Sequence, residues 1–363
     1  MKPIAMFLLS LSLAGQSVMP MPETLETDDT VHLRMFIAGD ALLHESVYTD
    51  AMKRDGTFDF HKQLDGILDQ VKDYDLAYYN QETILGGTAL GLSGYPTFNS
   101  PMEFGEYMVE KGFNLVSTAN NHCLDKGTAG IEASREFWNS QRNVAMDGTN
   151  AMEYESHMVP SIKVKGVRVA LLSYTYGTNG VIEENDWQVN DYPGNEKEML
   201  ARVQKARVEN DIVVVAMHWG TEYSHAVNDE QKTLARKLVE AGATIIIGNH
   251  PHAIQPFEWI GDVPVFYAMG NLVSTQIGED RRTGMLGSLD IDVDHNGKVT
   301  VSNARVAFTY VKYTGDLSVL RTDIEVLPFS RVTNAILPNP REYEQTFRDL
   351  MTSMDNKISF GLK

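Results

Sequence analysis

Metal-binding side chains follow the ends of several expected β-strands in this sequence. In chain order they are Asp40, Glu82, Asn121, His218, His250 and His252. Carboxylates, an amide oxygen and imidazoles form a mixed nitrogen and oxygen ligand set, which suits Mn, Zn or Fe at one or two positions. One histidine at the end of a buried strand would mean little, but the repeated placement favours a metal site. His250 and His252 are two residues apart, so an extended backbone would turn both toward one face.

Alternating strands and helices must position these side chains. Short apolar runs predict strands over residues 33–38, 76–79, 113–118, 167–174, 211–217, 244–247 and 265–269. Helical spacing lies between them, over residues 60–74, 103–111, 131–141, 196–209 and 229–241. Continuous apolar strands that alternate with helices are typical of parallel strands buried on both faces, so we expect an α/β fold. In open α/β sheets ligands bind beyond the carboxyl ends of the strands, where these polar residues lie.

The motifs that carry these residues resemble the CapA family, accessory proteins of poly-γ-glutamate capsule synthesis. The matching stretches are Gly39-Asp40, Asn80-Gln81-Glu82, Asn120-Asn121-His122, His218-Trp219-Gly220, His250-Pro251-His252 and Gly270-Asn271. The resemblance extends from Leu33 to Gln276. It implies a branch of the calcineurin-like metallophosphoesterases, with a four-layer α/β/β/α sandwich and a two-metal site.

The resemblance also implies a role for each residue. Asp40 resembles the first metal aspartate, Glu82 takes the place of the bridging aspartate, and Asn121 resembles the asparagine ligand. The remaining implied ligands are His218, His250 and His252. His122 resembles the histidine that protonates the leaving group, which makes it the catalytic candidate.

The sequence departs from the phosphoesterase pattern at one position. That pattern, Asp-x-His, places a histidine two residues after Asp40, where this chain has Leu42. One metal position therefore loses a ligand, unless His44 bends back to replace it. We expect one tightly held divalent metal ion, or two of which the second is weak.

Four further residues are candidates for substrate binding, each with an alternative that remains open. They are Asn120, Trp219, Tyr223 and Arg282. The alternative for Asn120 is that it holds the loop. Trp219 and Tyr223 could instead pack against neighbouring residues, and Arg282 could be a solvated surface charge. Asp125 is a candidate partner for an imidazole N–H, or a cap for the following helical turn.

The chain divides into a leader and one large domain. Residues 1–15 follow the plan of a secretory signal peptide, with an uncleaved anchor or a plain leader as alternatives. Residues 16–30 are expected to form a disordered linker and residues 31–282 the CapA-like domain. Residues 283–363 are expected to complete that domain with a β-hairpin and a helix. The protein would then be exported, to an extracellular or cell-surface location.

Composition narrows the function further. The formal net charge is −18, which disfavours nucleic acid as a partner. The lone Cys123 excludes an intramolecular disulfide and a cysteine-based zinc site. We expect a metal-dependent hydrolase or transferase that acts in poly-γ-glutamate capsule synthesis or processing, or on a phosphoester. The alternative is a non-catalytic accessory protein, in contact with a membrane complex of capsule synthesis, that binds or guides an anionic polymer. In either case bound metal would reverse the local negative potential.

Overall fold

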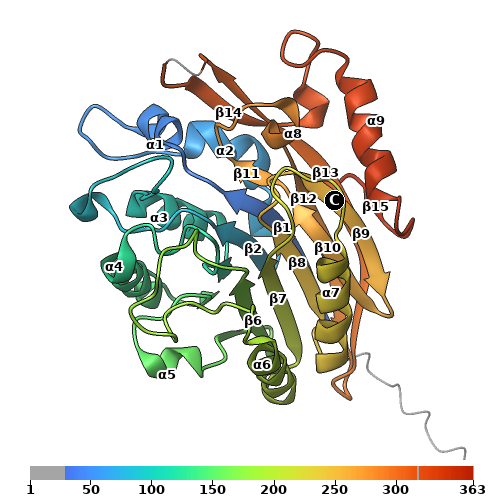
Figure 1. Cartoon of the computed structure of the whole chain (residues 1–363). Helices are drawn as coiled ribbons and strands as arrows, with labels where there is room; N and C mark the ends of the chain where they lie inside the picture. Colours follow the sequence, from blue (N-terminus) through green and yellow to red (C-terminus); the bar gives the residue numbers. More distant parts are fainter. Residues whose placement is uncertain (1–28, 317–318, 363) are drawn as a thin grey trace, which may run out of the picture.

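The computed structural model describes residues 29–316 and 319–362 (Figure 1). The expected signal peptide, residues 1–15, and the linker up to residue 28 lie outside the described residues. Within the described ranges, no helix has both the length and the apolar character that a membrane span requires.

The first sheet brings together the N-terminal strands and the C-terminal strands of the chain. Its order is β14-β13-β12-β1-β2-β3-β4, with β11 beside β1 and β15 beside β13. Strands β1 to β4 are parallel, and β12 to β14 are antiparallel. The bounds are β1 (Val31–Ala41), β2 (Leu76–Gln81), β3 (Leu115–Ser117), β4 (Ala145–Asp147), β11 (Asn271–Val273), β12 (Thr283–Val293), β13 (Val299–Thr314), β14 (Thr322–Pro328) and β15 (Ser359–Phe360).

The second sheet is built from the middle of the chain, in the order β5-β6-β7-β8-β10-β9. Its bounds are β5 (Ser161–Val164), β6 (Val167–Thr175), β7 (Ile212–His218), β8 (Ile245–Asn249), β9 (Ile254–Ile260) and β10 (Val263–Met269). Strands β6, β7, β8 and β10 are parallel, and β5 and β9 form antiparallel edges. Every residue of β7 and β8 is buried, as the continuous apolar runs predict.

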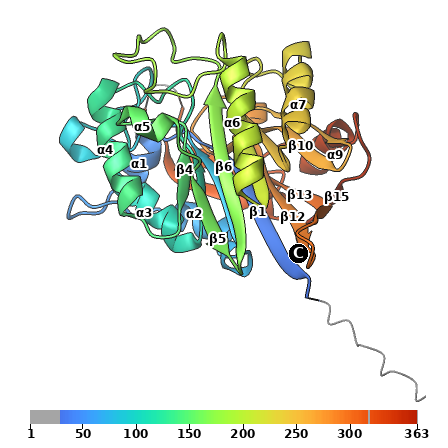
Figure 2. The same cartoon turned by 90° about the horizontal axis from the view of Figure 1, so that it is seen from below.

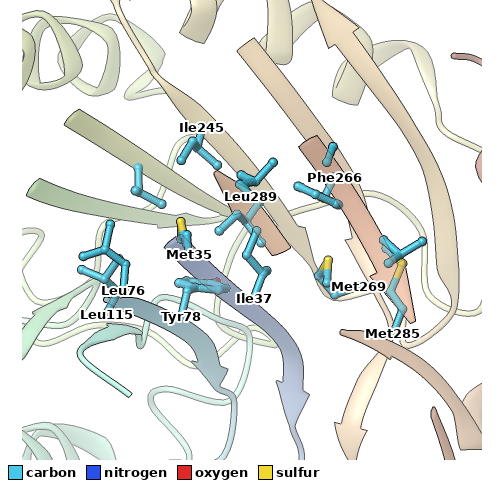
Figure 3. Close-up of a cluster of buried hydrophobic side chains, with 14 of the residues drawn as sticks. Met35, Ile37, Leu76, Tyr78, Leu115, Ile245, Phe266, Met269, Met285 and Leu289 are labelled. Carbon is cyan, nitrogen blue, oxygen red and sulfur yellow. The ribbon is translucent and has the colours of Figure 1, made fainter. Parts of the chain in front are cut away.

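The two sheets pack face to face over the main hydrophobic core (Figure 3). Met35 and Ile37 of β1 belong to the same buried cluster as Val214 of β7 and Ile245 of β8. Successive side chains of a strand point to opposite faces. The residue between the two β1 positions, Phe36, accordingly lies in a different cluster on the outer side of the first sheet.

Helices cover both outer faces, which makes four layers. α1 (Glu45–Ala51), α2 (His61–Leu68), α3 (Met102–Lys111) and α4 (Gly127–Ser140) share the outer cluster of the first sheet. α6 (Glu196–Glu209) and α7 (Asp229–Ala241) cover the second sheet and lie side by side in Figure 2. The expected four-layer α/β/β/α sandwich is therefore confirmed.

The C-terminal part extends the first sheet. β12 pairs with β1, and β12 and β13 form a hairpin whose turn is closed by the Asp294 side chain. α9 (Pro340–Met351) packs against β9 of the second sheet. The remaining short helices are η1 (Val71–Asp73), η2 (Thr88–Leu90), α5 (Glu153–Ser156), α8 (Glu279–Arg282) and η3 (Phe329–Arg331).

Candidate metal centre

The predicted ligands converge where the carboxyl ends of strands from the two sheets meet. Asp40 lies at the end of β1, Glu82 directly after β2, and His218 at the end of β7. All the predicted ligands are buried, with exposed fractions between 0% and 3%: Asp40, Glu82, Asn121, His218, His250 and His252. The packing of one sheet on the other thus brings together residues up to about two hundred positions apart, such as His250 and Asp40, whose backbone N–H and carboxylate are hydrogen-bonded.

Close backbone approach at this edge depends on glycine. A Cβ on Gly39 would overlap the carbonyl oxygen of Gly270, which accepts the hydrogen bond from the backbone N–H of Asp40. A Cβ on Gly248 would overlap the carbonyl oxygen of Tyr267. The two glycines therefore let the strands bring their polar ends into one centre.

Asp40, Glu82 and His252 form the tightest group of ligands. One ligand atom from each lies within 4.8 Å of the others. His252 Nδ1 is 3.4 Å from Asp40 Oδ2, and His252 Nε2 is 3.4 Å from Glu82 Oε1. The 3.4 Å between His252 Nε2 and Glu82 Oε1 is close to the separation of two donors around one divalent ion, since each donor would sit about 2.0–2.2 Å from a zinc ion. Nδ1 of the same ring faces Asp40 and Asn271.

Asn121, His218 and His250 form a second group that shares Glu82 with the first. His218 Nε2 lies 2.8 Å from Asn121 Oδ1 and 3.7 Å from Glu82 Oε1. The ring centroids of His218 and His250 are 4.8 Å apart. Glu82 thus lies between the two groups, in the position of a bridging carboxylate.

Several buried ligand atoms have no hydrogen-bond partner among the described residues. They are both carboxylate oxygens of Glu82 and Nδ1 of His250. Nδ1 of His218 is also unpartnered, but Nε2 of that ring is the atom that faces Glu82. Buried polar atoms are almost always hydrogen-bonded, and an isolated buried carboxylate is especially costly. A divalent cation satisfies carboxylate oxygens and neutral imidazoles together, so the residues present fit a metal ion.

The electrostatics agree with that fit. Burial raises the pKa of Glu82 well above its ordinary value, and the charge of Asp40 adds to this. Burial lowers the pKa of His218 far below its ordinary value, and burial with the neighbouring histidines lowers the pKa of His250 to about 3. Burial would also lower the pKa of His252, but the Glu82 and Asp40 carboxylates outweigh it and raise that pKa to about 9. A proton on His252 therefore offsets the two carboxylates, and a metal ion would displace it.

The histidine pair is held by a bent backbone rather than the extended one we expected. His250 has φ +98° and His252 has φ +54°, in the left-handed region that non-glycine residues seldom adopt. The carbonyl of Pro251 between them accepts a hydrogen bond of 2.7 Å from the Tyr223 backbone N–H. Backbone conformations of this kind cost about 1–3 kcal/mol each and persist where surrounding contacts enforce them.

His122 lies beside the two ligand groups and has its own carboxylate partner. His122 Nδ1 is 2.8 Å from Asp125 Oδ2, which also accepts a hydrogen bond of 2.6 Å from the Phe98 backbone N–H. The Phe98 ring packs edge-on against the imidazole, at 4.7 Å between centroids. Asp125 therefore takes the imidazole-partner role and holds Nδ1 of His122.

His44 does not take the place of the histidine that the phosphoesterase pattern has at the position of Leu42. Its Nδ1 lies 3.2 Å from the carbonyl oxygen of Leu42 and 3.4 Å from the backbone nitrogen of Thr275. Its ring packs on Phe98, at 5.3 Å between centroids. Burial lowers the pKa of His44 to about 4, so the ring is neutral and occupied by backbone contacts.

The four predicted substrate contacts fall in different places. Asn120 is buried, donates to the carbonyl of Gln81 and accepts from the His122 backbone N–H, so it shapes the loop. Trp219 is completely buried, with its indole N–H bonded to the backbone of the second sheet, which makes it a packing residue. Only Tyr223 lies open beside the ligands, with 43% of the residue exposed.

Arg282, the fourth, is turned away from the centre. Its Nε donates a 2.8 Å hydrogen bond to the carbonyl of Val311, and its guanidinium lies over the rings of Tyr310 and Tyr313. These contacts hold α8 against β13. Among the described residues Arg282 therefore has a packing role.

Asparagine and tyrosine side chains around the ligands were not anticipated as supports. Asn80 Nδ2 donates a 2.8 Å hydrogen bond to Asp40 Oδ1, and Asn271 Oδ1 lies 3.0 Å from His252 Nδ1. Tyr176 packs against His250, at 4.5 Å between ring centroids. Asn80 follows a strand as the ligands do, so its position was a usable signal, whereas the contact of Tyr176 depends on the loop path.

Comparison with known proteins places the chain among capsule synthesis proteins. A model of the family described as "Bacterial capsule synthesis protein PGA_cap" matches residues 34–276. The "PGA biosynthesis protein CapA" of Bacillus subtilis (strain 168) is 30% identical over 195 residues, 53% of this chain and 51% of that protein. The "Capsule biosynthesis protein CapA" of Bacillus anthracis is 34% identical over 173 residues, 46% of this chain and 41% of that protein. The chain thus spans about half the length of the curated relatives it matches.

A solved structure with a similar course of the chain is the calcineurin-like phosphoesterase YfkN from Bacillus subtilis. It is 12% identical, covers 88% of this chain and 99% of that one, and has a TM-score of 0.43. The family match covers the strands and loops that supply every ligand described above. The chain belongs to the bacterial capsule synthesis protein (PGA_cap) family.

Proposed function

We propose that this protein is an exported metal-dependent hydrolase or transferase that acts on a γ-glutamyl polymer of a capsule, or on a phosphoester. The observation that carries the proposal is Glu82, a completely buried carboxylate without a hydrogen-bond partner among the described residues. It lies between His252 on one side and His218 on the other. Family membership supports the capsule role, and the donor set supports the metal.

The two ligand groups differ in how closely their donor atoms are gathered. Asp40, Glu82 and His252 supply three ligand atoms within 4.8 Å of one another, although Leu42 stands where a further imidazole is expected. On the other side of Glu82, His218 Nε2 lies 3.7 Å from Glu82 Oε1 and 2.8 Å from Asn121 Oδ1, and the His250 ring lies beside the His218 ring. We therefore infer that Glu82 serves both groups. When bound, divalent cations supply Lewis acidity that polarises the bond to be broken.

The chain's own residues supply proton transfer and orientation. Asp125 holds Nδ1 of His122, which leaves Nε2 as the atom that delivers a proton to the leaving group. Phe98 and Tyr176 pack against the imidazoles and exclude water from them. Asn271 orients His252 through its second ring nitrogen, as partners of metal-bound histidines commonly do.

A second candidate function is a non-catalytic protein that binds or guides an anionic polymer. The leucine at position 42 favours it, because a centre short of one ligand is less suited to two-metal chemistry. In this alternative, the metal would serve only to attract the carboxylates of the polymer. This protein would otherwise repel them, since its own net charge is −18.

The test is metal analysis of protein purified without chelator, combined with a turnover screen on generic phosphoesters and γ-glutamyl oligomers. We expect bound divalent metal in the parent and loss of both metal and turnover in His250→Ala. His295→Ala is the matched control, because this histidine is exposed on the β12–β13 turn. Metal with no turnover in the parent would favour the binding function, and equal metal in parent and His250→Ala would contradict both.

Export is part of the proposal and rests on the sequence of residues 1–15. It is tested by N-terminal sequencing of protein recovered from outside the producing cell. A start beyond the apolar run is the expected result, and recovery only inside the cell would contradict it.

A further inference from the structure

Arg281 lies on the ring of Tyr223, which in turn lies beside the predicted ligand His252. Its guanidinium carbon is 3.8 Å from the centroid of the Tyr223 ring. The other neighbour of that ring is the ligand His252, at 6.1 Å between ring centroids. Tyr223 is 43% exposed, and Arg281 is partly exposed, so this ring joins the buried ligand to an accessible positive charge.

The short helix that carries Arg281 is tied to the ligand. Asn271 Nδ2 donates a 2.8 Å hydrogen bond to the carbonyl of Arg281, while Asn271 Oδ1 lies 3.0 Å from His252 Nδ1. The neighbouring Asp280 accepts a 2.6 Å hydrogen bond from the hydroxyl of Tyr343 in α9. α8 lies beside β11, the strand of Asn271 (Figure 1). The guanidinium is therefore presented at a set place relative to the ligand, which lowers the entropy cost of using it.

The hydrogen-bond donors of this guanidinium are not used by any residue that the structure describes. No described residue accepts a hydrogen bond from the Arg281 side chain, and no described carboxylate forms an ion pair with it. Arg135 and Arg202, in contrast, form close ion pairs with Glu155 and Asp147. With 49 acidic and 31 basic residues in the chain, an arginine held on a ring and left without an acid is suited to an outside anion.

We propose that Arg281, held on Tyr223, binds an oxyanion of the substrate beside the metal centre, so that it determines specificity for anionic substrates. The proposal rests on the proposed function, because it places this anion next to the bond that the centre acts on. A guanidinium presents paired N–H donors in a planar fork that matches a carboxylate or a phosphate. Glu222, which precedes Tyr223 and is exposed, repels anions. The positive charge of Arg281 offsets this repulsion.

The experiment measures binding of two probes, a γ-glutamyl tetramer and p-nitrophenyl phosphate, by calorimetry on the metal-loaded protein. The variants are Arg281→Ala, Arg281→Lys and Tyr223→Leu. Arg142→Ala is the matched control, an exposed arginine after α4. We expect Arg281→Ala to weaken binding of at least one probe about tenfold or more, because the loss of a hydrogen bond to a charged group reduces affinity by about that factor. Arg281→Lys retains the charge without the fork and should fall between parent and alanine variant.

Metal content, measured on every variant, separates this inference from the proposed function. We expect it to be unchanged in Arg281→Ala, and Tyr223→Leu to weaken binding by loss of the supporting ring. The probe that responds identifies the anion, a carboxylate for the tetramer and a phosphate for the ester. The inference is overturned if Arg281→Ala binds both probes as the parent does, or if the parent binds neither. A different result would separate the two proposals. If the parent takes up no metal but binds the tetramer, and Arg281→Ala weakens that binding, the metal centre is contradicted and the role of Arg281 is retained.

Discussion

Glu82 carries the strongest chemical signal at the scale of single residues. A completely buried carboxylate normally accepts several hydrogen bonds, and neither of its oxygens accepts one from a described residue. The ring nitrogens closest to it are Nε2 of His252, at 3.4 Å, and Nε2 of His218, at 3.7 Å. A bound cation between these groups removes the cost that burial places on the charge.

The first prediction concerns Glu82→Gln. This change retains the shape of the side chain and removes the charge that a divalent ion needs. We expect metal to raise the thermal midpoint of the parent and not that of the variant, because a ligand that binds only the folded state stabilises it by mass action. The gain in the parent should be about 2.7 kcal/mol at a metal concentration a hundredfold above the dissociation constant. Thermal unfolding with added metal and with chelator measures it, and an equal gain in both proteins would argue against Glu82 as a ligand.

The second prediction distinguishes His122 from the ligands. His122→Ala should retain most of the bound metal and lose about 10²–10⁴-fold in turnover, the usual contribution of a general acid. Asp125→Asn should lose less, because Asp125 acts through His122. Metal content and turnover are measured together with His250→Ala, which should lose both. If His122→Ala loses metal as His250→Ala does, His122 is a ligand and the acid lies elsewhere.

The gathering of the candidate ligands in one place could be predicted from residue type and position, whereas the contacts of the residues around them could not. Asp40 and His218 stand at strand ends, a pattern visible in the sequence. Arg281 and Arg282 are adjacent and chemically identical, and only the turn of α8 decides that one faces Tyr223 and the other Tyr313. Trp219 directly follows a ligand, yet its ring lies in the core of the second sheet.

At the scale of elements, the two sheets depend on links that hold their facing ends together. Asp147 ends β4 of the first sheet, and Arg202 lies on α6 outside the second. Their side chains form a paired contact at 2.7 Å and 2.9 Å, and the backbone N–H of Ser173 in β6 donates to the same carboxylate. This buried network connects β4, β6 and α6.

The third prediction is that breaking this pair destabilises the protein without removing metal. Arg202→Ala leaves the Asp147 carboxylate buried, with 2% of its side chain exposed, and lacking its main positive partner. We expect a loss of about 3–5 kcal/mol in the free energy of unfolding, the usual cost of removing one partner of a buried pair. Denaturant unfolding measures it. The exposed pair of Lys62 and Asp323 is the control, since Lys62→Ala should cost less than about 1 kcal/mol. A comparable loss in both variants would show that the buried network has no special role.

The long apolar strands were predictable, and the edge strands were not. β7 and β8 are continuous apolar runs, and their observed bounds differ from the predicted ones by one or two residues. β9 contains Pro256 and lies at an antiparallel edge, where a missing backbone N–H is tolerated, so its sequence gives a weak strand signal. β4 spans only Ala145–Asp147, and its pairing with β3 is what defines it. The positive φ angles of His250 and His252 are likewise set by contacts from distant segments.

At the scale of the whole molecule, the negative net charge of the chain and the positive charge of the proposed metal have opposite effects on the binding of an anionic polymer. A chain of net charge −18 repels a polyanion over its surface, and the proposed centre provides positive charge in one place. Arg281 lies on Tyr223, the exposed ring beside His252. Binding of an anionic polymer is thus expected only where metal and this arginine act together.

The fourth prediction follows from that balance. A γ-glutamyl oligomer should bind the metal-loaded protein and fail to bind after chelation, and added salt should weaken the binding because exposed charges are screened. Calorimetric titration of both forms at two salt concentrations measures it. Equal affinity with and without metal would indicate that polymer recognition lies away from the centre.

The central claim, that the strand ends form a metal centre, is tested most directly by anomalous scattering from a crystal grown with Mn²⁺. We predict an anomalous peak about 2.0–2.2 Å from an oxygen of Glu82, within reach of His218 and His250. A second peak is expected beside Asp40 and His252, whose ligand atoms lie within 4.8 Å of one another and of Glu82. A map from crystals grown with Mn²⁺ that shows no peak at Glu82 would contradict the account.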